Sequence, residues 1–409
     1  TLQTNPDKTI ASLKDTYKDV FPIVGVGAGI ASILGKNGSE FISQQYNAVT
    51  PGDEMKPDAI LGSTIGKLVK PTDEVSADKT DFITVEDAKS MGYIIPDNYT
   101  SYDDNRFKSA TGEYAVPRLN FDNVDKLMKA AHENGVKLRG HTLVWHQQTP
   151  KYFFQQNYKI TTGQKYNTSK ECMDTRLEFY VKTVMNHVLS SEYADCLYSY
   201  DVVNEYLHSA NAEKDSKNIT YWGLIYGTYD KSVKDHGVTL RPSYVKDAFK
   251  YAHEMLVKYD RLDVKLIYND YNCYQNPENI IHLVDYINSD GKVCDGIGMQ
   301  SHLDITDSFH SATNYAKALE YFRLNCPDLE IQITELDATM VSTEDKPLTD
   351  EDQAAYYDQI MNAILTNKKN GGNITALIIW SLYDGVSWRP AKFPCLFNGL
   401  YMPKAAFYA

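Results

Sequence analysis

Eight short apolar runs alternate with helix-forming segments along the whole chain of 409 residues. The runs cover 23–26, 46–50, 137–144, 199–204, 264–269, 295–300, 330–334 and 375–381. Apolar residues at helical spacing fill segments between them, at 123–134, 174–189, 243–259 and 351–367. Short apolar runs of this kind are typical of buried parallel strands. Eight strand–helix units predict a single-domain (β/α)₈ TIM barrel over residues 1–409, with its site at the C-terminal strand ends.

Two of these runs end in a glutamate. Glu205 follows the fourth run in YDVVNE (200–205), and Glu335 follows the seventh in IQITELD (331–337). Glu rarely lies beside an apolar core without a partner or a task. A strand-end salt bridge could explain either residue alone. Two of them at one barrel mouth indicate a carboxylate pair that flanks a scissile bond, one group acting as acid and base and the other as nucleophile.

Polar and aromatic side chains gather at the other strand ends, in RGHTLVWHQQ (139–148), YNDYN (268–272), MQSH (299–302) and IWSLYD (379–384). Asn204 is placed to hydrogen-bond a sugar hydroxyl beside the reacting carbon, where such bonds strengthen as charge develops. His302 can keep the seventh-strand carboxylate ionised, and Asp337 can orient that histidine. Burial near Trp145 would raise the pKa of Glu205, as a general acid requires.

The indole faces of Trp380 and Trp388 suit the flat faces of sugar rings. Metal binding is the competing use of His141, His146 and His302. The first two are five residues apart on an expected strand, so their rings point to opposite faces. The six cysteines show no Cys-x-x-Cys spacing, and disulfides remain open. We therefore expect no metal and no cofactor.

The chain carries 54 acidic and 41 basic residues, a net charge of −13. This balance argues against nucleic acid and anionic membranes as partners, because both attract basic surfaces. No apolar run is long enough to cross a bilayer. We expect a soluble monomer that acts on a neutral partner. The chain starts at Thr1 without an apolar leader, which fits a mature secreted protein or a trimmed cloning boundary.

The segment 57–120, between the second and third strands, is longer than a barrel unit needs. Its turn-forming stretches, KPTDE (70–74) and PDNYTSYDDN (96–105), predict an elaborated loop or small subdomain on the rim that carries the site. A passive decoration is the plainer interpretation. The alternative, which we predict, is that the segment borders the glycone end of the cleft.

Three motifs together resemble glycoside hydrolase family 10, the endo-β-1,4-xylanases: GHTLVWH (140–146), DVVNE (201–205) and ITELD (333–337). The resemblance covers nearly the whole chain. It implies that Glu205 is the general acid/base and Glu335 the nucleophile of a retaining, endo-acting xylan hydrolase. It also implies substrate contacts on the glycone side and at the centre by Lys56, His141, Trp145, Gln148, Asn204, Gln300, His302, Trp380 and Trp388, and near the aglycone side by Tyr271 and Asn272.

The sequence departs from the family pattern after the second strand. Many members read Glu-Asn-x-Met-Lys there, whereas this chain reads GDEMK (52–56). Gly52 thus replaces one polar side chain that grips the substrate. Asp53 replaces the other, and it accepts hydrogen bonds but donates none. Lys56 is close enough in sequence to neutralise its charge.

Two other functions compete with xylan hydrolysis. A β-1,4-glucanase could use the same scaffold, although bulky Trp380 and Trp388 should exclude the hydroxymethyl group of glucose. A non-catalytic carbohydrate-binding barrel would normally have lost a carboxylate, and both are present here. Because polymeric xylan cannot enter a cell, we expect the protein to be secreted, with its signal peptide already removed.

Overall fold

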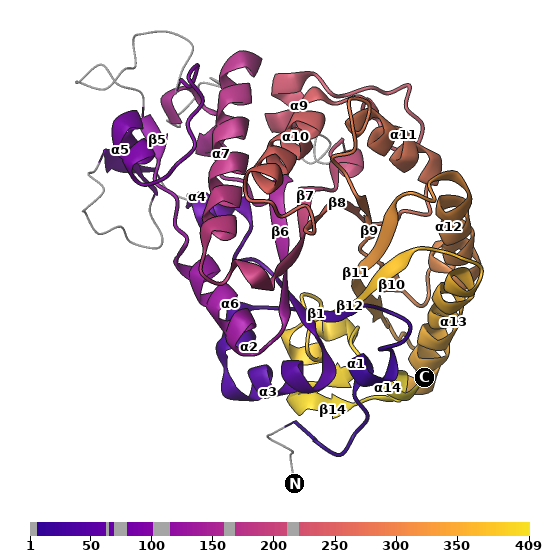
Figure 1. The fold of residues 1–409 in the computed structure, drawn as a ribbon. Helices are drawn as coiled ribbons and strands as arrows, with labels where there is room; N and C mark the ends of the chain where they lie inside the picture. Colours follow the sequence, from indigo (N-terminus) through magenta and orange to yellow (C-terminus); the bar gives the residue numbers. More distant parts are fainter. Residues whose placement is uncertain (1–5, 63–64, 69–79, 101–114, 159–167, 211–220) are drawn as a thin grey trace.

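Eight parallel strands close into a barrel inside a ring of helices (Figure 1). The computed structural model describes residues 6–62, 65–68, 80–100, 115–158, 168–210 and 221–409. In barrel order the strands are β1 Ile23–Ala28, β2 Ala48–Pro51, β6 Lys137–Trp145, β7 Leu197–Asn204, β8 Lys265–Asp270, β9 Gly296–Met299, β11 Glu330–Thr339 and β12 Ile374–Trp380. Parallel pairings of β9 with β11 and of β12 with β1 complete the ring, which confirms the predicted fold.

The helices that cover the barrel lie between successive strands. They are α2 Ile30–Leu34, α3 Lys36–Gln45, α6 Asp122–Glu133, α7 Lys170–Ser190, α10 Ser243–Lys258, α11 Pro277–Ile287, α12 Ala312–Asn325 and α13 Asp350–Lys369. Local sequence sets several of their ends. Thr349 and Asp352 form a capping box at the start of α13, and Lys368 and Lys369 lie in its last turn, where a positive charge favours the helix dipole.

The inside of the barrel is partly polar. Arg139 on β6 donates two hydrogen bonds of 2.5 Å to the carboxylate of Asp201 on β7, and its Nε donates to Gln332 on β11 at 2.7 Å. All three side chains are fully buried. Strand alternation points Arg139 and His141 into the barrel, whereas Gly140 between them packs against the ring of Tyr200. A buried ion pair therefore joins the adjacent strands β6 and β7, and the hydrogen bond to Gln332 reaches across the barrel to β11.

The seventh strand is longer than predicted. The sequence indicated a strand that ends at residue 334, but β11 continues to Thr339. The extension forms because β10, His302–Asp304, pairs in parallel with residues 337–339 above the barrel. Glu335 consequently lies within a strand rather than at its end.

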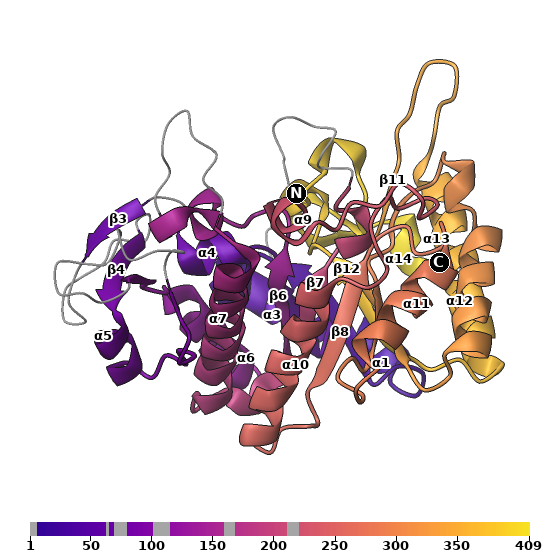
Figure 2. The ribbon, with the colours of Figure 1, turned by 90° about the horizontal axis from the view of Figure 1, so that it is seen from above.

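The insert between β2 and β6 contains a helix and a separate small sheet. Its described elements are α4 Pro57–Leu61, β3 Ile65–Leu68, β4 Thr80–Thr84, α5 Val85–Ser90 and β5 Ala115–Pro117, with sheet order β3-β4-β5. Figure 2 shows the small sheet and α5 at the side of the barrel, beyond α4 and α7. Tyr93 stacks on Phe179 of α7 at 6.1 Å, and the backbone N–H of Ile94 donates to Thr183 Oγ1 at 3.0 Å. The described part of the insert thus packs on α7, and also on residues 152–158, where Phe82 contacts the rings of Tyr152 and Tyr158.

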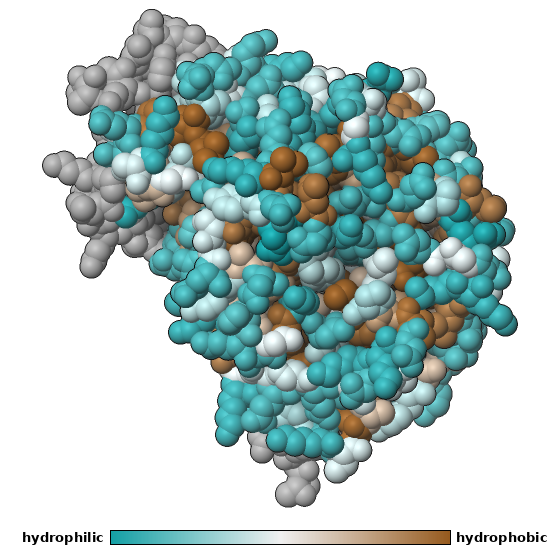
Figure 3. Space-filling model, in the orientation of Figure 1, coloured by the Kyte–Doolittle hydropathy of each residue, from teal (hydrophilic) through white to brown (hydrophobic). Residues whose placement is uncertain are grey.

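The six cysteines are all buried and free, so the disulfides left open by the sequence do not form. Among the described helices, none is both long and apolar enough to cross a membrane. The face of the molecule in Figure 3 is largely hydrophilic, with apolar side chains in scattered patches.

Candidate active site

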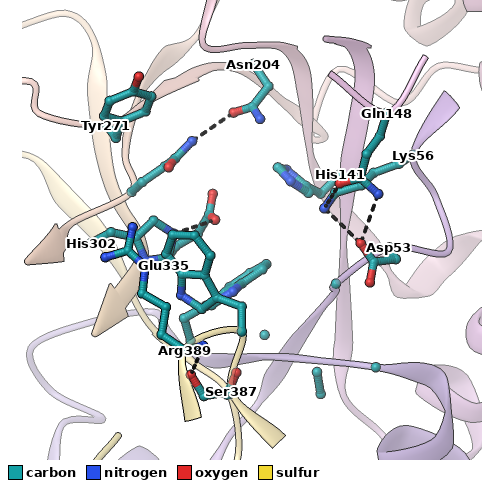
Figure 4. Close-up of a pocket in the computed structure, with 18 of the residues that line it drawn as sticks. Asp53, Lys56, His141, Gln148, Asn204, Tyr271, His302, Glu335, Ser387 and Arg389 are labelled. Atoms are coloured by element: carbon teal, nitrogen blue, oxygen red, sulfur yellow. Dashed lines mark hydrogen bonds and ion pairs between the residues drawn. The ribbon is translucent and has the colours of Figure 1, made fainter. Parts of the chain in front are cut away.

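The C-terminal ends of the barrel strands surround a cavity of about 730 Å³. Nearly all the residues predicted for the site line it: Asp53, Lys56, His141, Trp145, Gln148, Asn204, Glu205, Tyr271, Asn272, Gln300, His302, Glu335, Trp380 and Trp388. Asp337 is buried directly behind His302. Figure 4 shows Glu335 and His302 on one side of the cavity and Asp53 with Lys56 on the other.

Glu205 follows the last residue of β7 and has a left-handed backbone conformation, with φ 60° and ψ 27°. Side chains other than Gly, Asn and Asp rarely adopt it, and such residues concentrate at functional sites. Trp145 Nε1 and Gln300 Nε2 each donate to one carboxylate oxygen at 2.9 Å. Burial raises the pKa of Glu205 to about 7, although the two donors act in the opposite direction. The group is therefore protonated in mildly acidic solution.

Glu335 has the opposite electrostatic environment. Burial alone would raise its pKa, but a hydrogen bond from His302, the charges of His141 and His302, and a hydrogen bond from Asn269 lower it to about 2. His302 Nε2 lies 3.1 Å from Glu335 Oε1, and Asn269 Nδ2 donates to Oε2 at 2.8 Å. This carboxylate stays ionised across the whole ordinary pH range.

His302 is held between two carboxylates. Its Nδ1 lies 2.7 Å from Asp337 Oδ1, while its Nε2 faces Glu335. Burial would lower the pKa of the imidazole, but Asp337 and Glu335 outweigh it and raise the pKa to about 10. Both ring nitrogens therefore carry protons and donate. Asp337 also accepts from Trp388 Nε1 at 2.8 Å, which connects the cavity wall to this group.

Three amide side chains link the two glutamates. Gln300 Nε2 donates to Glu205 and, at 3.1 Å, to Asn204 Oδ1. Asn269 Nδ2 donates to the same Asn204 oxygen at 3.0 Å and to Glu335. Because both donors occupy the Asn204 oxygen, its amide nitrogen is left to donate to a ligand in the cavity. The predicted hydrogen bond from Asn204 to a sugar hydroxyl stays a prediction.

The buried ion pair of the barrel interior supports the site from below. His141 Nδ1 lies 2.8 Å from Asp201 Oδ2, the carboxylate that also receives Arg139. The ring of His141 is thereby held at the cavity floor, where its charge contributes to the low pKa of Glu335. Its other ring nitrogen is left for a ligand.

The departure at residues 52–56 forms an ion pair. Lys56 Nζ lies 3.0 Å from Asp53 Oδ1 and donates to Gln148 Oε1 at 3.0 Å. Burial would raise the pKa of Asp53, but the Lys56 ammonium and the Gln148 amide outweigh it, so the pKa is lowered. A Cβ at Gly52 would have backbone atoms of Ala28 no nearer than 3.9 Å, so this wall of the cavity is open.

Two tryptophans form the wall beside Glu335. Trp380, at the end of β12, covers Gly27 so closely that a Cβ there would lie 2.1 Å from the indole. Trp388 is 51% exposed, and the guanidinium of Arg389 lies 3.8 Å above its ring. On the opposite side of the cavity, Tyr271 stacks on His208 with ring centroids 3.9 Å apart.

Several functional neighbours were missed from the sequence. Asn269 touches Glu335 directly, yet the run YNDYN offered five polar or aromatic side chains with no indication of which one turns inward. Arg139 and Asp201 stand in the runs 139–148 and 201–205, but the sequence indicated no separate role for either residue. His208 donates to Asp270 at 2.7 Å beneath Tyr271, and only its position three residues after Glu205 could have drawn attention to it. In the part of the chain that the structure describes, no three His, Cys, Asp or Glu side chains are placed to hold a metal ion.

The insert contributes little to the cavity. None of its described residues lines the cavity, although the backbone N–H of Asp58 in α4 donates to the carbonyl of Gln148 at 2.8 Å. Residues 63–64, 69–79 and 101–114 lie outside the described part of the chain. The hypothesis that the segment borders the glycone end stays a prediction; among the described residues, Asp58 contacts Gln148, which lines the cavity.

Known proteins are similar to this chain in sequence and in fold. The profile of Glycosyl hydrolase family 10 matches residues 12–409. Endo-1,4-beta-xylanase A of Butyrivibrio fibrisolvens is 40% identical over 90% of this chain and 75% of its own length. The bifunctional endo-1,4-beta-xylanase XylA of Ruminococcus flavefaciens is 30% identical over 97% of this chain, which spans only 33% of that protein.

Two solved structures of xylanases are similar to this structure over nearly the whole chain. The Clostridium thermocellum N-terminal endo-1,4-beta-D-xylanase 10B, complexed with xylohexaose, superposes with a TM-score of 0.71 and 26% identity, covering 98% of this chain and 67% of that one. The intracellular xylanase of Thermoanaerobacterium saccharolyticum gives a TM-score of 0.68 and 25% identity over 99% of both chains.

Proposed function

Because the chain belongs to glycosyl hydrolase family 10, we propose that it hydrolyses internal β-1,4-xylosidic bonds of xylan with retention of anomeric configuration. The main support for this mechanism is that two carboxyl groups in one cleft have pKa values shifted in opposite directions. Glu205 is raised to about 7 and Glu335 is lowered to about 2. Such a pair supplies a protonated acid and an ionised nucleophile at the same pH.

In the first step, the Glu335 carboxylate attacks the anomeric carbon and the glycosidic C–O bond breaks. Glu205 gives its proton to the departing oxygen, and a glycosyl ester forms on Glu335. The protonated His302 and the amide of Asn269 hold the attacking oxygens in place through the contacts described above. As positive charge develops on the sugar, the Asn204 amide can donate to the neighbouring 2-hydroxyl.

In the second step, water attacks the anomeric carbon from the face vacated by the leaving group. Glu205, now ionised, takes a proton from this water, and the bond to Glu335 breaks to release its carboxylate. The electrostatics favour this change of role. The negative charge of Glu335 is one of the causes that raise the pKa of Glu205, and the ester removes that charge. The pKa of Glu205 therefore falls once the ester has formed, so the carboxylate stays ionised and is available to accept the proton of the water.

The walls of the cleft fit a polysaccharide of neutral sugars. Trp380 and Trp388 offer ring faces beside Glu335, and Lys56 and Gln148 offer polar groups at one end. Tyr271 and Asn272 line the other end, which the family resemblance assigns to the aglycone. Asp53 is neutralised by Lys56, so it adds an acceptor to the glycone side without a free negative charge.

The test of the activity is reducing-sugar release from xylan and, in parallel, from carboxymethylcellulose. We expect rapid release from xylan and little from the cellulose derivative. A well-folded protein that releases no sugar from xylan would refute the proposal, and a preference for carboxymethylcellulose would favour the glucanase alternative.

The roles of the two glutamates need separate variants. Glu335→Ala should lose turnover and be partly rescued by azide, with an inverted glycosyl azide as the product. Glu205→Ala should still form the ester from substrates with good leaving groups, and azide should then give a retained product. Glu344→Ala, in an exposed loop away from the cleft, is the matched control and should keep full activity. An inverted azide from Glu205→Ala alone would exchange the two assignments.

We also propose that the protein acts outside the cell as a monomer. The size of its polymeric substrate supports the first point, while one structural relative is described as intracellular. Detection of the protein in culture supernatant and its elution volume on size exclusion test the two points.

A further inference from the structure

Among the described residues, most charged side chains that line the cleft have a partner of opposite charge. Asp53 pairs with Lys56, and Glu335 pairs with the protonated His302. Arg389 also lines the cavity, yet among the described residues no carboxylate or carbonyl oxygen accepts a hydrogen bond from its guanidinium. In a protein with a net charge of −13, this leaves an uncompensated cation at the edge of the reaction centre.

Arg389 is held in place rather than free to move. Its guanidinium lies 3.8 Å from the centre of the Trp388 ring, a cation–π contact. The indole N–H of Trp388 donates to Asp337, and the backbone N–H of Arg389 donates to Ser387 Oγ at 3.0 Å. The contacts fix the position of the guanidinium and leave its N–H groups to donate to a ligand. Because the group is preorganised, a ligand that binds it loses little side-chain entropy.

Its position restricts what it can bind. Figure 4 shows Arg389 on the side of the cavity that carries Glu335 and His302, across from the Asp53–Lys56 pair. His310 lies near it on the same wall, and burial and the charge of Arg389 are among the causes that lower the pKa of that imidazole. Arg389 therefore belongs to the cavity wall that carries Glu335.

The backbone of xylan is uncharged, so it cannot form an ion pair with Arg389. A planar guanidinium matches a carboxylate, with which it can form two parallel hydrogen bonds. We propose that Arg389 binds the carboxylate of a uronic acid branch on the xylan chain, so that the enzyme prefers acidic xylan over the same polymer without charge. The inference rests on the proposed function, because it concerns a branch of that substrate.

A packing role is the competing explanation. In that case Arg389 only covers the exposed face of Trp388, and its loss would affect charged and neutral substrates equally. The ratio of the two rates separates the explanations, since damage to Trp388 cancels in the ratio and loss of a charge-specific contact does not.

The experiment uses two xylo-oligosaccharides with one glucuronosyl branch, identical except that the carboxylate of the second is a methyl ester. We expect the wild type to have a higher kcat/KM for the acid, and Arg389→Gln to lower the acid-to-ester ratio about tenfold, the effect of losing a charge-assisted hydrogen bond. Arg389→Lys, which keeps the charge but not the fork, should lower the ratio less. Lys392→Gln, an exposed lysine in the same loop, removes equal charge and should leave the ratio unchanged.

A measurement on the wild type alone supports the variants. Added salt should reduce the acid-to-ester ratio, because it screens the attraction between guanidinium and carboxylate. A wild-type ratio near one, or an equal ratio in the wild type and Arg389→Gln, would overturn the inference. If Arg389→Gln did not fold, the Lys variant and the salt dependence would decide. Neutral xylohexaose is assayed beside them, and a wild type that fails to cleave it would refute the proposed function itself.

Discussion

The hydrogen bond from Trp145 to Glu205 should set the alkaline limit of activity. Glu205 must be protonated in the free enzyme to act as acid, so kcat/KM is expected to fall above its pKa of about 7. Trp145 Nε1 donates to Glu205 Oε2 at 2.9 Å, and this donor stabilises the ionised form and lowers the pKa. Trp145→Phe removes the N–H but keeps an aromatic ring in the wall. The pKa of Glu205 should then rise, and the alkaline limb should move to higher pH.

The size of this shift follows from the hydrogen bond. A bond to a charged group contributes about 1.5–3 kcal/mol, and one pKa unit corresponds to about 1.4 kcal/mol. Gln300 still donates to the other oxygen, so we expect the lower end, a shift of about one pH unit. The assay is kcat/KM against pH on a soluble xylo-oligosaccharide. Trp222→Phe, at a buried indole that contacts Tyr244, is the control and should leave the limb in place. A limb that stays or moves to lower pH in Trp145→Phe would refute the reasoning.

Three further predictions concern stability and packing. Burial raises the pKa of Glu205 from 4.5 to about 7, so its ionisation destabilises the fold progressively between these values. The wild type should therefore lose about 3 kcal/mol of its free energy of unfolding between pH 4 and pH 8, and Glu205→Gln should not show this loss. Urea unfolding at both pH values tests this, and an equal stability difference between variant and wild type at the two pH values would contradict it. Gly27→Ala places a Cβ 2.1 Å from Trp380 and should lower kcat/KM at least tenfold, about 1.4 kcal/mol, with a changed near-UV circular dichroism signal. Arg139→Leu leaves the buried Asp201 carboxylate with His141 as its remaining side-chain partner and should cost about 3 kcal/mol, the lower end for a broken buried pair, in thermal unfolding. Unchanged stability in that variant would contradict this prediction.

The barrel could be predicted because its strands are buried on both faces. Such strands must be apolar, and their spacing along the chain is visible without coordinates. Glu205 and Glu335 stood out because they break the apolar pattern. Asp337 was singled out in the same way, as a carboxylate two residues past Glu335 that could orient His302. These inferences needed only local patterns.

The contacts that set the chemistry depend on neighbours far apart in sequence. Asn269 reaches Glu335 because Gly298 on the next strand has no side chain, and a Cβ there would lie 2.3 Å from the Asn269 oxygen. No pattern around residue 269 indicates this gap. The insert shows the same limit, since aromatic residues such as Tyr93 could have faced either the cleft or α7. The length of β11 was also underestimated, because its extension depends on pairing with β10.

The position of Glu335 inside β11 makes the two halves of the site mechanically unequal. The backbone N–H groups of Glu335 and Asp337 donate to Gln300 and Ser301 at 2.9 and 3.2 Å, so the strand is tethered on both sides of the glutamate. The backbone N–H of Glu205 also donates to a neighbouring strand, to the carbonyl of Asn269 at 2.8 Å, but the chain then leaves the sheet in a short turn with Glu205 in a left-handed conformation. Any adjustment needed when the leaving sugar departs and water enters should therefore occur on the Glu205 side. We expect Glu335 to move less than Glu205 during the reaction. Crystallographic snapshots along the pathway should therefore superpose best on β11.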